Sequence, residues 1–165
     1  MTPDGATVAV LLMTNFGERN RLTVDGVPVG RLLGPDPGPD GQPAGSCIGV
    51  AVTDAAVDGH GCSRLARRIG LGLARTGSVG HHGSGEVFLA AATGLRADRG
   101  GTYERVATVS GRALDPLFEA VVDASEEAAL NSMLASPTVT GRGGNRREGL
   151  PADEVVRMLR SHGRL

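Results

Sequence analysis

Three short runs of apolar residues interrupt the chain, and each has the length of a β-strand. They span residues 7–13, 47–53 and 87–92. The second run alternates large with small residues, so one face can fill a core while the other lies close against a neighbour. Continuous apolar runs of this length are typical of strands that are covered on both faces. The pattern therefore predicts three strands, each buried on both faces.

Apolar residues that recur every three or four positions predict helices. Within residues 64–73, Leu65, Ile69 and Leu73 form such a stripe, and the arginines between them lie mostly away from it. We interpret these arginines as a solvated face, with a functional basic patch as the alternative. The stretch is therefore predicted to be an amphipathic helix.

Two further helices are predicted nearer the C-terminus. One runs from Asp115, a candidate N-cap followed by Pro116, to about Ala135. Apolar or small residues follow one of its faces: Leu117, Val121, Ala124 and Ala128. The other begins near Pro151 and ends before Gly163. One-sided helices and two-sided strands together predict an α/β fold, with stacked sheets and helices outside them.

A tight turn and a flexible segment separate the first two strands. Asp25-Gly26, flanked by apolar residues at 22–24 and 27–29, is a strong signal for a two-residue hairpin turn. Residues 33–44 then follow, rich in proline and glycine and without periodicity. Such a segment is expected to be exposed, mobile and accessible to proteases.

Composition narrows the class of protein. A length of 165 residues favours one domain, and an aromatic content of 2% means that the core is aliphatic. The net charge of −1 gives no electrostatic reason to expect nucleic acid or an anionic membrane as a partner. The N-terminus lacks the layout of a signal peptide and no apolar run is long enough to cross a bilayer, so we expect a cytoplasmic protein. Cys47 and Cys62 are expected to be reduced, structural thiols.

Gly45-Ser46 joins the flexible segment to the second strand. A serine hydroxyl is a poor nucleophile near neutral pH and needs a base within hydrogen-bond reach. Cleavage of the Gly45–Ser46 bond would supply one on the same residue, because an α-amino group has a pKa of about 7.7 to 8.0. The alternative is that Gly45-Ser46 only ends a loop and starts a strand.

Residues 75–86 form a polar, glycine-rich loop before the third strand. The loop contains His81, His82, Ser84 and Glu86. Adjacent histidines suit a metal site poorly on a strand, because alternate side chains point to opposite faces, and no further ligand stands at metal-binding spacing. Nor does the loop match a phosphate-binding or dinucleotide-binding motif. Two interpretations remain: a structural loop, or a hydroxyl–carboxylate pair, Ser84 and Glu86, that serves a nucleophile elsewhere.

Several longer stretches follow one another in a consistent order from about Thr7 onward. They are TNFG at 14–17, DGVPVGR at 25–31, Gly45-Ser46 opening a strand that ends in TDA at 53–55, RLARRIGLGLARTGS at 64–78, GSGE at 83–86 and LDPLFEA at 114–120. Together they resemble the DmpA family of self-processing L-aminopeptidase/D-esterases and β-aminopeptidases. Several ordered motifs are far more specific than any one of them alone.

The resemblance implies a precursor that is cut at Gly45–Ser46, with Ser46 as the N-terminal nucleophile of the smaller subunit. It implies a four-layer αββα sandwich similar to the N-terminal-nucleophile hydrolases, without metal or cofactor. Ser84 and Glu86 correspond to the serine and acidic partners of the nucleophile, and Asn15 to the asparagine that stabilises the oxyanion. The implied substrates are small peptides, amino-acid amides or esters, and a homo-oligomer is expected.

One departure concerns the N-terminal side of the family pattern. Family precursors carry a long portion ahead of the strand at residue 7, including an active-site tyrosine, and Tyr103 matches no such position. We therefore expect residues 1–165 to be a single domain that forms the C-terminal part of such an enzyme and needs the missing N-terminal portion. Residues 1–45 would end the larger subunit, with the mobile leader at 33–45, and residues 46–165 would form the smaller one.

Three classes of function stay open from the sequence. The first is the autoprocessed aminopeptidase. The second is an inactive remnant or a partner subunit of such an enzyme. The third is an acyl-transfer or ligand-binding relative of the ornithine acetyltransferases, which typically cut ahead of threonine, so that Ser46 disfavours it. Within the first class, a shifted cut could instead make the thiol of Cys47 the attacking group.

Overall fold

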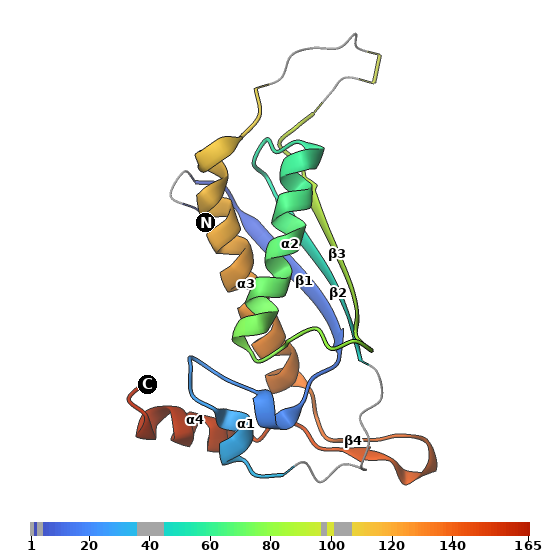
Figure 1. Ribbon diagram of the computed structural model, residues 1–165, viewed down its shortest axis with the longest axis vertical. Helices are drawn as coiled ribbons and strands as arrows, with labels where there is room; N and C mark the ends of the chain where they lie inside the picture. Colours follow the sequence, from blue (N-terminus) through green and yellow to red (C-terminus); the bar gives the residue numbers. More distant parts are fainter. Residues whose placement is uncertain (1, 3–4, 36–44, 97–98, 101–106) are drawn as a thin grey trace.

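A computed structural model describes residues 2, 5–35, 45–96, 99–100 and 107–165. Residues 36–44, most of the predicted leader, and Tyr103 lie outside the described residues. The fold consists of a three-stranded sheet, two long helices packed on it, and a smaller unit of short helices at one end (Figure 1).

The three predicted strands form this sheet in chain order. They are β1 (Val8–Asn15), β2 (Ser46–Thr53) and β3 (Gly85–Ala92). Strand β2 lies in the centre, antiparallel to β1 and parallel to β3. Because β2 and β3 are parallel, the chain must cross over the sheet between them, and helix α2 (Gly59–Arg75) makes that crossover. The end of β1 and the beginnings of β2 and β3 therefore meet at the same edge of the sheet.

Helices α2 and α3 (Asp115–Ala135) cover one face of the sheet. The side chain of Asp58 caps the start of α2 by accepting a hydrogen bond of 2.7 Å from the backbone N–H of Gly61. The predicted stripe of Leu65, Ile69 and Leu73 is buried in the main core, which confirms the amphipathic helix.

Small residues let α2 and α3 approach closely. A Cβ atom at Gly72 would lie 2.4 Å from the carbonyl oxygen of Val122, so that any side chain there would force the helices apart. Opposite it, Ser125 is fully buried and satisfies its hydroxyl by donating to the carbonyl of Val121 at 2.6 Å. The predicted stripe on α3 is confirmed at Val121 but continues through Ser125 and Ala129, not through Ala124 and Ala128.

The start of α3 differs from the prediction. The 3-10 helix η2 (Gly111–Leu114) leads directly into it, so Leu114 holds the N-cap position and Asp115 is the first helical residue. Among the described residues, no side chain caps this helix end. The preceding turn replaces the cap, and the negative charge of Asp115 still lies in the first helical turn, where the helix dipole favours it.

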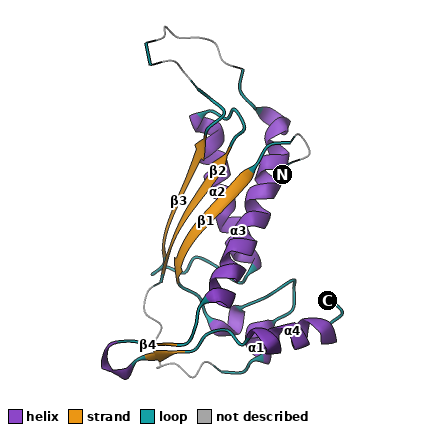
Figure 2. Cartoon of the chain, turned by 180° about the vertical axis from the view of Figure 1, so that it is seen from behind, coloured by secondary structure: helices purple, strands orange, loops and turns teal. Residues whose placement is uncertain are grey.

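The other face of the sheet is open. Leu11 and Met13 of β1 expose 75% and 72% of their surface, and Ile48, Val87 and Leu89 are also exposed. Viewed from behind, the strands lie in front of the helices (Figure 2). The prediction that these strands are buried on both faces is therefore wrong for this chain by itself. The described residues supply one sheet layer and one helix layer, two of the four layers that the resemblance implies.

A small second core lies below the sheet edge. It joins α1 (Val29–Leu32) and α4 (Ala152–Ser161) through Val27, Val29 and Val155. The predicted turn at Asp25-Gly26 is confirmed, since both residues have positive φ angles of 48° and 75°. The predicted hairpin reduces to a single bridge between Val24 and Val27, because α1 begins two residues later.

Four short elements complete the described fold. The 3-10 helix η1 (Arg19–Arg21) follows β1. An exposed ribbon of β4 (Val139–Thr140) and β5 (Arg146–Arg147), joined by η3 (Arg142–Gly144), precedes α4. No helix among the described residues is long and apolar enough to cross a membrane.

Candidate active site

Asn15 and Ser46 meet at the edge of the sheet where the three strands converge. Asn15 ends β1, Ser46 begins β2, and the two are register partners in the antiparallel pair. Both are exposed, and both belong to the open face of the sheet. Gly85, the first residue of β3, is the partner of Ser46 on its other side. A Cβ atom at Gly85 would lie 3.4 Å from Ser46 Oγ, so glycine leaves space beside this hydroxyl.

Gly45 is held tightly by its neighbours. A Cβ atom at this position would lie 2.6 Å from the carbonyl oxygen of Asn15 and 2.5 Å from Phe16 Cβ, which only glycine avoids. The backbone N–H of Gly85 donates a hydrogen bond of 3.2 Å to the carbonyl oxygen of Gly45. The carbonyl group ahead of Ser46 is thus fixed and polarised by a donor from β3.

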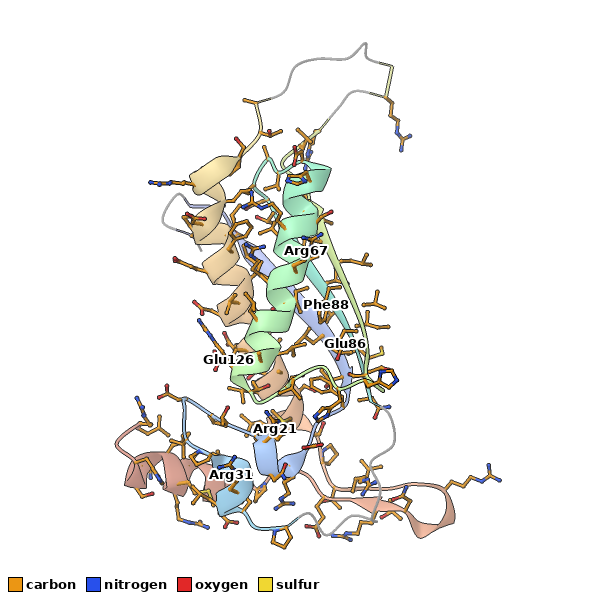
Figure 3. The ribbon with its side chains drawn as sticks, in the orientation of Figure 1. Arg21, Arg31, Arg67, Glu86, Phe88 and Glu126 are labelled. Carbon is orange, nitrogen blue, oxygen red and sulfur yellow. The ribbon has the colours of Figure 1, made fainter. Side chains whose placement is uncertain are left out.

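Ser84 and Glu86 form a second pair, at the start of β3. The hydroxyl of Ser84 donates a hydrogen bond to Glu86 Oε1, and its backbone N–H donates to the carbonyl oxygen of His81 at 2.7 Å. Glu86 is the register partner of Cys47 and shares the helix-covered face with Phe88 (Figure 3). The Ser84–Glu86 bond that joins this pair therefore lies on the side of the sheet away from Ser46.

The structure brings the four candidate residues to one edge but in two groups. Asn15 and Ser46 lie next to each other on the open face, and Ser84 and Glu86 are joined by a hydrogen bond on the covered face. Gly85 stands between Ser84 and Glu86 in the chain and beside Ser46 in space. Among the described residues, no hydrogen bond joins Ser46 to any of the other three side chains, so the groups are linked through the backbone of Gly85.

Cys47 cannot readily take the place of Ser46 as a nucleophile. Its side chain points into the core and is 1% exposed. Burial, and after it the nearby negative charge of Glu86, raise the pKa of the Cys47 thiol above its ordinary value of 9.0. Because the thiolate is the reactive form, the thiol of Cys47 is both shielded and poorly ionised. The geometry therefore argues against a cut that is shifted to Cys47.

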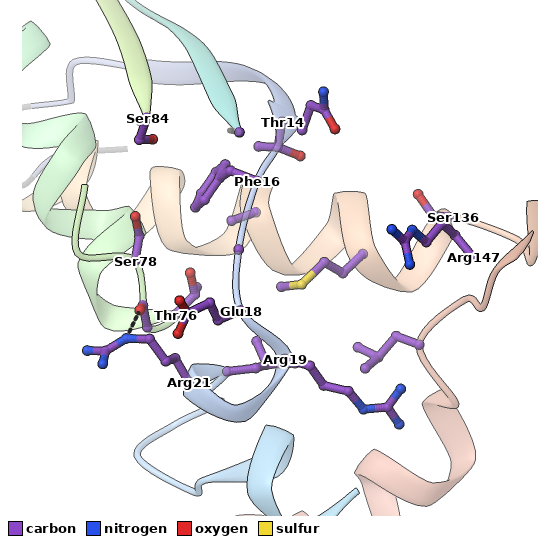
Figure 4. A pocket seen from close by; sticks show the side chains of 18 of the residues that line it. Thr14, Phe16, Glu18, Arg19, Arg21, Thr76, Ser78, Ser84, Ser136 and Arg147 are labelled. Atoms are coloured by element: carbon purple, nitrogen blue, oxygen red, sulfur yellow. Dashed lines mark hydrogen bonds between the residues drawn. The ribbon is translucent and has the colours of Figure 1, made fainter. Parts of the chain in front are cut away.

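A pocket of about 870 Å³ adjoins this edge (Figure 4). Its walls come from residues 14–19, 76–81 and 147–151, together with Gly45, Ser84 and the end of α3. The loop at 76–81 is anchored to η1: Arg21 Nε donates to the carbonyl oxygen of Gly77 at 3.2 Å, drawn as a dashed line in Figure 4. Gly77 permits this approach, since it has a φ of 105° and a Cβ there would lie 2.0 Å from the carbonyl oxygen of Arg21.

Of the two histidines of the loop, His81 lines the pocket. His81 Nδ1 stands 3.6 Å from Glu18 Oε1, and His82 is exposed. Within the described ranges, no group of three His, Cys, Asp or Glu residues is placed to hold a metal ion.

Sequence reasoning missed charged residues of the pocket wall: Glu18, Arg19, Arg21, Arg147 and Glu148. Arg19 and Arg21 follow shortly after the end of β1. Their position near the end of a strand is the signal that could have identified them. Arg147 comes to the same pocket from a segment more than a hundred residues later, and no local pattern predicts that.

Comparison with known proteins identifies the family. The model of peptidase family S58 matches residues 1–147. The chain belongs to peptidase family S58. This membership, with the relatives below, confirms the resemblance to the DmpA family that the sequence motifs indicated.

Two similar proteins match this chain over nearly all of its length. The beta-peptidyl aminopeptidase BapA of Sphingosinicella xenopeptidilytica is 34% identical over 171 residues, covering 94% of this chain and 42% of that protein. A Pyrococcus horikoshii crystal structure superposes with a TM-score of 0.87 at 38% identity, covering 96% of this chain and 44% of the other. The chain thus spans less than half the length of these relatives.

A third relative indicates the type of fold. The L-aminopeptidase D-Ala-esterase/amidase of Ochrobactrum anthropi, described as a variant of the Ntn hydrolase fold, superposes with a TM-score of 0.85 at 33% identity. The match covers 97% of this chain and 45% of that one. The predicted α/β fold of the N-terminal-nucleophile type is therefore confirmed.

Proposed function

We propose that this chain carries the nucleophile of a self-processing aminopeptidase that removes the N-terminal residue of small peptides, amides or esters. Membership of family S58 and similarity to aminopeptidases support the reaction class. The observation that carries the proposal is the arrangement around one peptide bond. The carbonyl oxygen of Gly45 accepts a hydrogen bond from Gly85, directly ahead of the exposed hydroxyl of Ser46.

Processing begins at this bond. Ser46 Oγ attacks the carbonyl carbon of Gly45 and gives up its proton, and the resulting oxyanion is held by the N–H of Gly85. The C–N bond then breaks, the nitrogen of Ser46 takes up a proton, and Gly45 is left as an ester on Ser46 Oγ. Water hydrolyses this ester, which releases the carboxylate of Gly45 and leaves Ser46 with a free α-amino group and a free hydroxyl.

The same groups then serve the substrate. The new α-amino group accepts the proton of Ser46 Oγ as the hydroxyl attacks the substrate carbonyl. Departure of Gly45 frees the N–H of Gly85, which already points at the position of a carbonyl oxygen. We assign it, with the side-chain amide of Asn15, to the oxyanion that forms on the substrate. Each such donor is typically worth about 10² to 10³ in rate.

Ser84 and Glu86 act through the backbone between them. Their hydrogen bond closes a short loop around Gly85 and restrains the direction of its N–H. We propose that they position this donor and the proton network at Ser46. Their role is then a positioning one, which fits their place on the covered face of the sheet.

The open apolar face of the sheet concerns how the active enzyme is assembled. Isolated apolar side chains are normal on a surface, but a whole sheet face with Leu11, Met13 and Leu89 exposed marks an interaction site. We propose that a further sheet covers this face in the active enzyme, as the αββα sandwich implies. The 165-residue chain by itself is then expected to show little peptidase activity. Its homo-oligomeric state and cytoplasmic location stay predictions.

Aminopeptidase assays on alanyl and β-alanyl amides test the proposal. The chain is produced together with the part of the Ochrobactrum anthropi enzyme that lies outside the match, so that both sheets are present. We expect turnover, and we expect Asn15→Ala to lower kcat by about 10² to 10³ because one oxyanion donor is lost. Asn131→Ala, on the exposed side of α3, is the matched control and should leave turnover unchanged. Equal rates for the two variants would contradict the role of Asn15.

A further inference from the structure

The side chain of Arg19 holds a buried donor without an acceptor. Its Nε lies out of contact with solvent and has no hydrogen-bond partner among the described residues. Buried donors in native proteins are nearly always satisfied, so each exception calls for a water or a ligand that completes it. Arg19 and Asn15 line the same pocket, and Figure 4 shows the side chain of Arg19 there. A water or a molecule bound in the pocket can supply the missing acceptor.

The other arginines of the pocket differ in whether their side chains already make a hydrogen bond within the protein. Arg21 already donates from Nε to the carbonyl oxygen of Gly77. Arg147 lines the same pocket, and the described residues include no ion pair for either Arg147 or Arg19. Arg19 and Arg147 line this pocket without an ion pair among the described residues and are therefore available to a ligand.

The acidic groups of the pocket do not neutralise these two arginines. Glu18 Oε1 faces His81 Nδ1 at 3.6 Å. Glu148 Oε1 faces Arg146 Nη2 at 3.8 Å. Since each carboxylate has its own basic partner, the ligand that completes Arg19 must bring a negative charge or an acceptor of its own.

The spacing along the chain sets the size of that ligand. Arg19 comes four positions after Asn15, so their Cα atoms can lie at most about 14 Å apart. One residue of an extended peptide spans about 3.5 Å. A peptide whose scissile carbonyl lies at Asn15 and Ser46 therefore reaches the guanidinium of Arg19 with one to three residues of its leaving part.

We propose that Arg19, assisted by Arg147, binds the C-terminal carboxylate of a short peptide substrate. This inference rests on the proposed aminopeptidase function and adds a preference to it. Dipeptides and tripeptides with a free carboxylate are bound better than the same peptides with a C-terminal amide. The planar guanidinium matches a carboxylate with two parallel hydrogen bonds, which an uncharged amide cannot accept in the same way.

Binding tests this preference on the assembled enzyme with Ser46→Ala, in which residues 1–45 and 46–165 are produced as separate pieces together with the remaining portion of the Ochrobactrum anthropi enzyme. Gly45 is then not joined to residue 46, the peptide is not consumed and no turnover is required. β-Alanyl-alanine and its C-terminal amide are titrated by calorimetry. The acid is expected to bind about tenfold more tightly than the amide, which corresponds to about 1.4 kcal/mol. Adding Arg19→Gln should abolish this difference between acid and amide. Arg67→Gln, an exposed arginine on α2, is the matched control and should keep it (Figure 3).

Arg147→Gln is a second test of the same site. It replaces Arg19→Gln if circular dichroism shows that the Arg19→Gln variant does not fold. Its acid preference should fall by about threefold, because Arg147 is exposed and its charge is screened by solvent. Equal Kd values for acid and amide in the parent chain, no binding of either peptide, or displacement of the acid by acetate or inorganic phosphate at similar concentrations would each overturn the proposal. Failure of the chain to cleave at Gly45–Ser46 would count against the proposed function and leave this binding result standing.

Discussion

The two faces of the sheet differ in what covers them and in what they carry. One face lies under α2 and α3, holds Cys47 and Glu86, and forms the main core. The other is open, carries Ser46 and Asn15 at its edge, and leaves Leu11 and Met13 mostly exposed. The covered face therefore stabilises this chain, while the open face presents the proposed nucleophile at a surface that the described residues leave exposed.

The difference shows how one strand serves both purposes. Successive side chains of β2 alternate, so that Ser46 points to the open face and Cys47 to the core. The close packing of α2 against the small residues of this strand fixes its register, because a Cβ at Gly49 would lie 2.9 Å from Ile69 Cγ2. A rigid core on one side thereby positions a reactive edge on the other.

Stability should depend on the covered face. Leu65→Ala removes a buried side chain of α2 that is 1% exposed, and we expect it to lower the free energy of unfolding by about 2 to 5 kcal/mol. Leu11→Ala is the same substitution on the open face and should change it by no more than about 0.5 kcal/mol. Urea denaturation followed by circular dichroism measures both. Similar losses for the two variants would show that the open face is covered after all.

Catalysis should need both faces. In the assembled enzyme we expect Ser84→Ala and Glu86→Gln to lower kcat by about 10² or more, since proton transfer and its positioning typically contribute about 10² to 10⁴. Folding should be largely retained, as read by circular dichroism. His81→Ala and His82→Ala are controls on the same loop and should matter much less. Loss of turnover in the histidine variants, with recovery on adding zinc, would instead indicate a metal site.

Association should depend on the open face. We expect the isolated chain to self-associate, because exposed apolar edges and faces pair with other chains. Met13→Lys combined with Leu89→Glu places opposite charges on that face and should shift the protein toward monomer in size-exclusion chromatography with light scattering. Leu71→Lys removes an exposed leucine from α2 and is the control. An unchanged profile in the double variant, or a shift in the control, would contradict this account.

The smallest effect concerns pH. The raised pKa of the Cys47 thiol means that the native state keeps this proton at pH values where the unfolded chain has lost it. Its contribution to stability is therefore present below the unfolded pKa and is lost as pH rises through the folded pKa. We expect Cys47→Ala to flatten the decline in unfolding free energy as the pH rises above the ordinary pKa of a thiol. An unchanged slope would show that Cys47 ionises freely in the native state.

Local patterns predicted most of the elements. The strand runs and the stripe of Leu65, Ile69 and Leu73 are local signals, and β2 and α2 form where those signals stand. The cap at Asp115 was predicted wrongly, because a preceding 3-10 turn can satisfy a helix start as well as a side chain can. The hairpin after Asp25 gave way to α1, which packs Val29 into the second core.

Long-range placement could not be predicted from the chain alone. That Glu86 lies on the face opposite Ser46 follows from the parallel register of β2 and β3, which no local pattern contains. The apolar runs alone do not predict the open face, because they report what a strand can bury and not what is available to cover it. The expectation of an exposed face came from the missing N-terminal portion that the resemblance implies. The pocket forms because residues near Arg19 and residues near Arg147, which are far apart in the sequence, line the same cavity.

The central claim is that the Gly45–Ser46 bond is cut to expose Ser46 as the nucleophile. Intact-mass measurement with N-terminal sequencing tests it most directly, on the chain produced with the remaining portion of a family S58 relative. The account predicts two fragments, the second beginning at Ser46, and a single uncut mass for Ser46→Ala beside normal cutting in the control Ser63→Ala. A chain that stays whole, or a new N-terminus at any other residue, would contradict it.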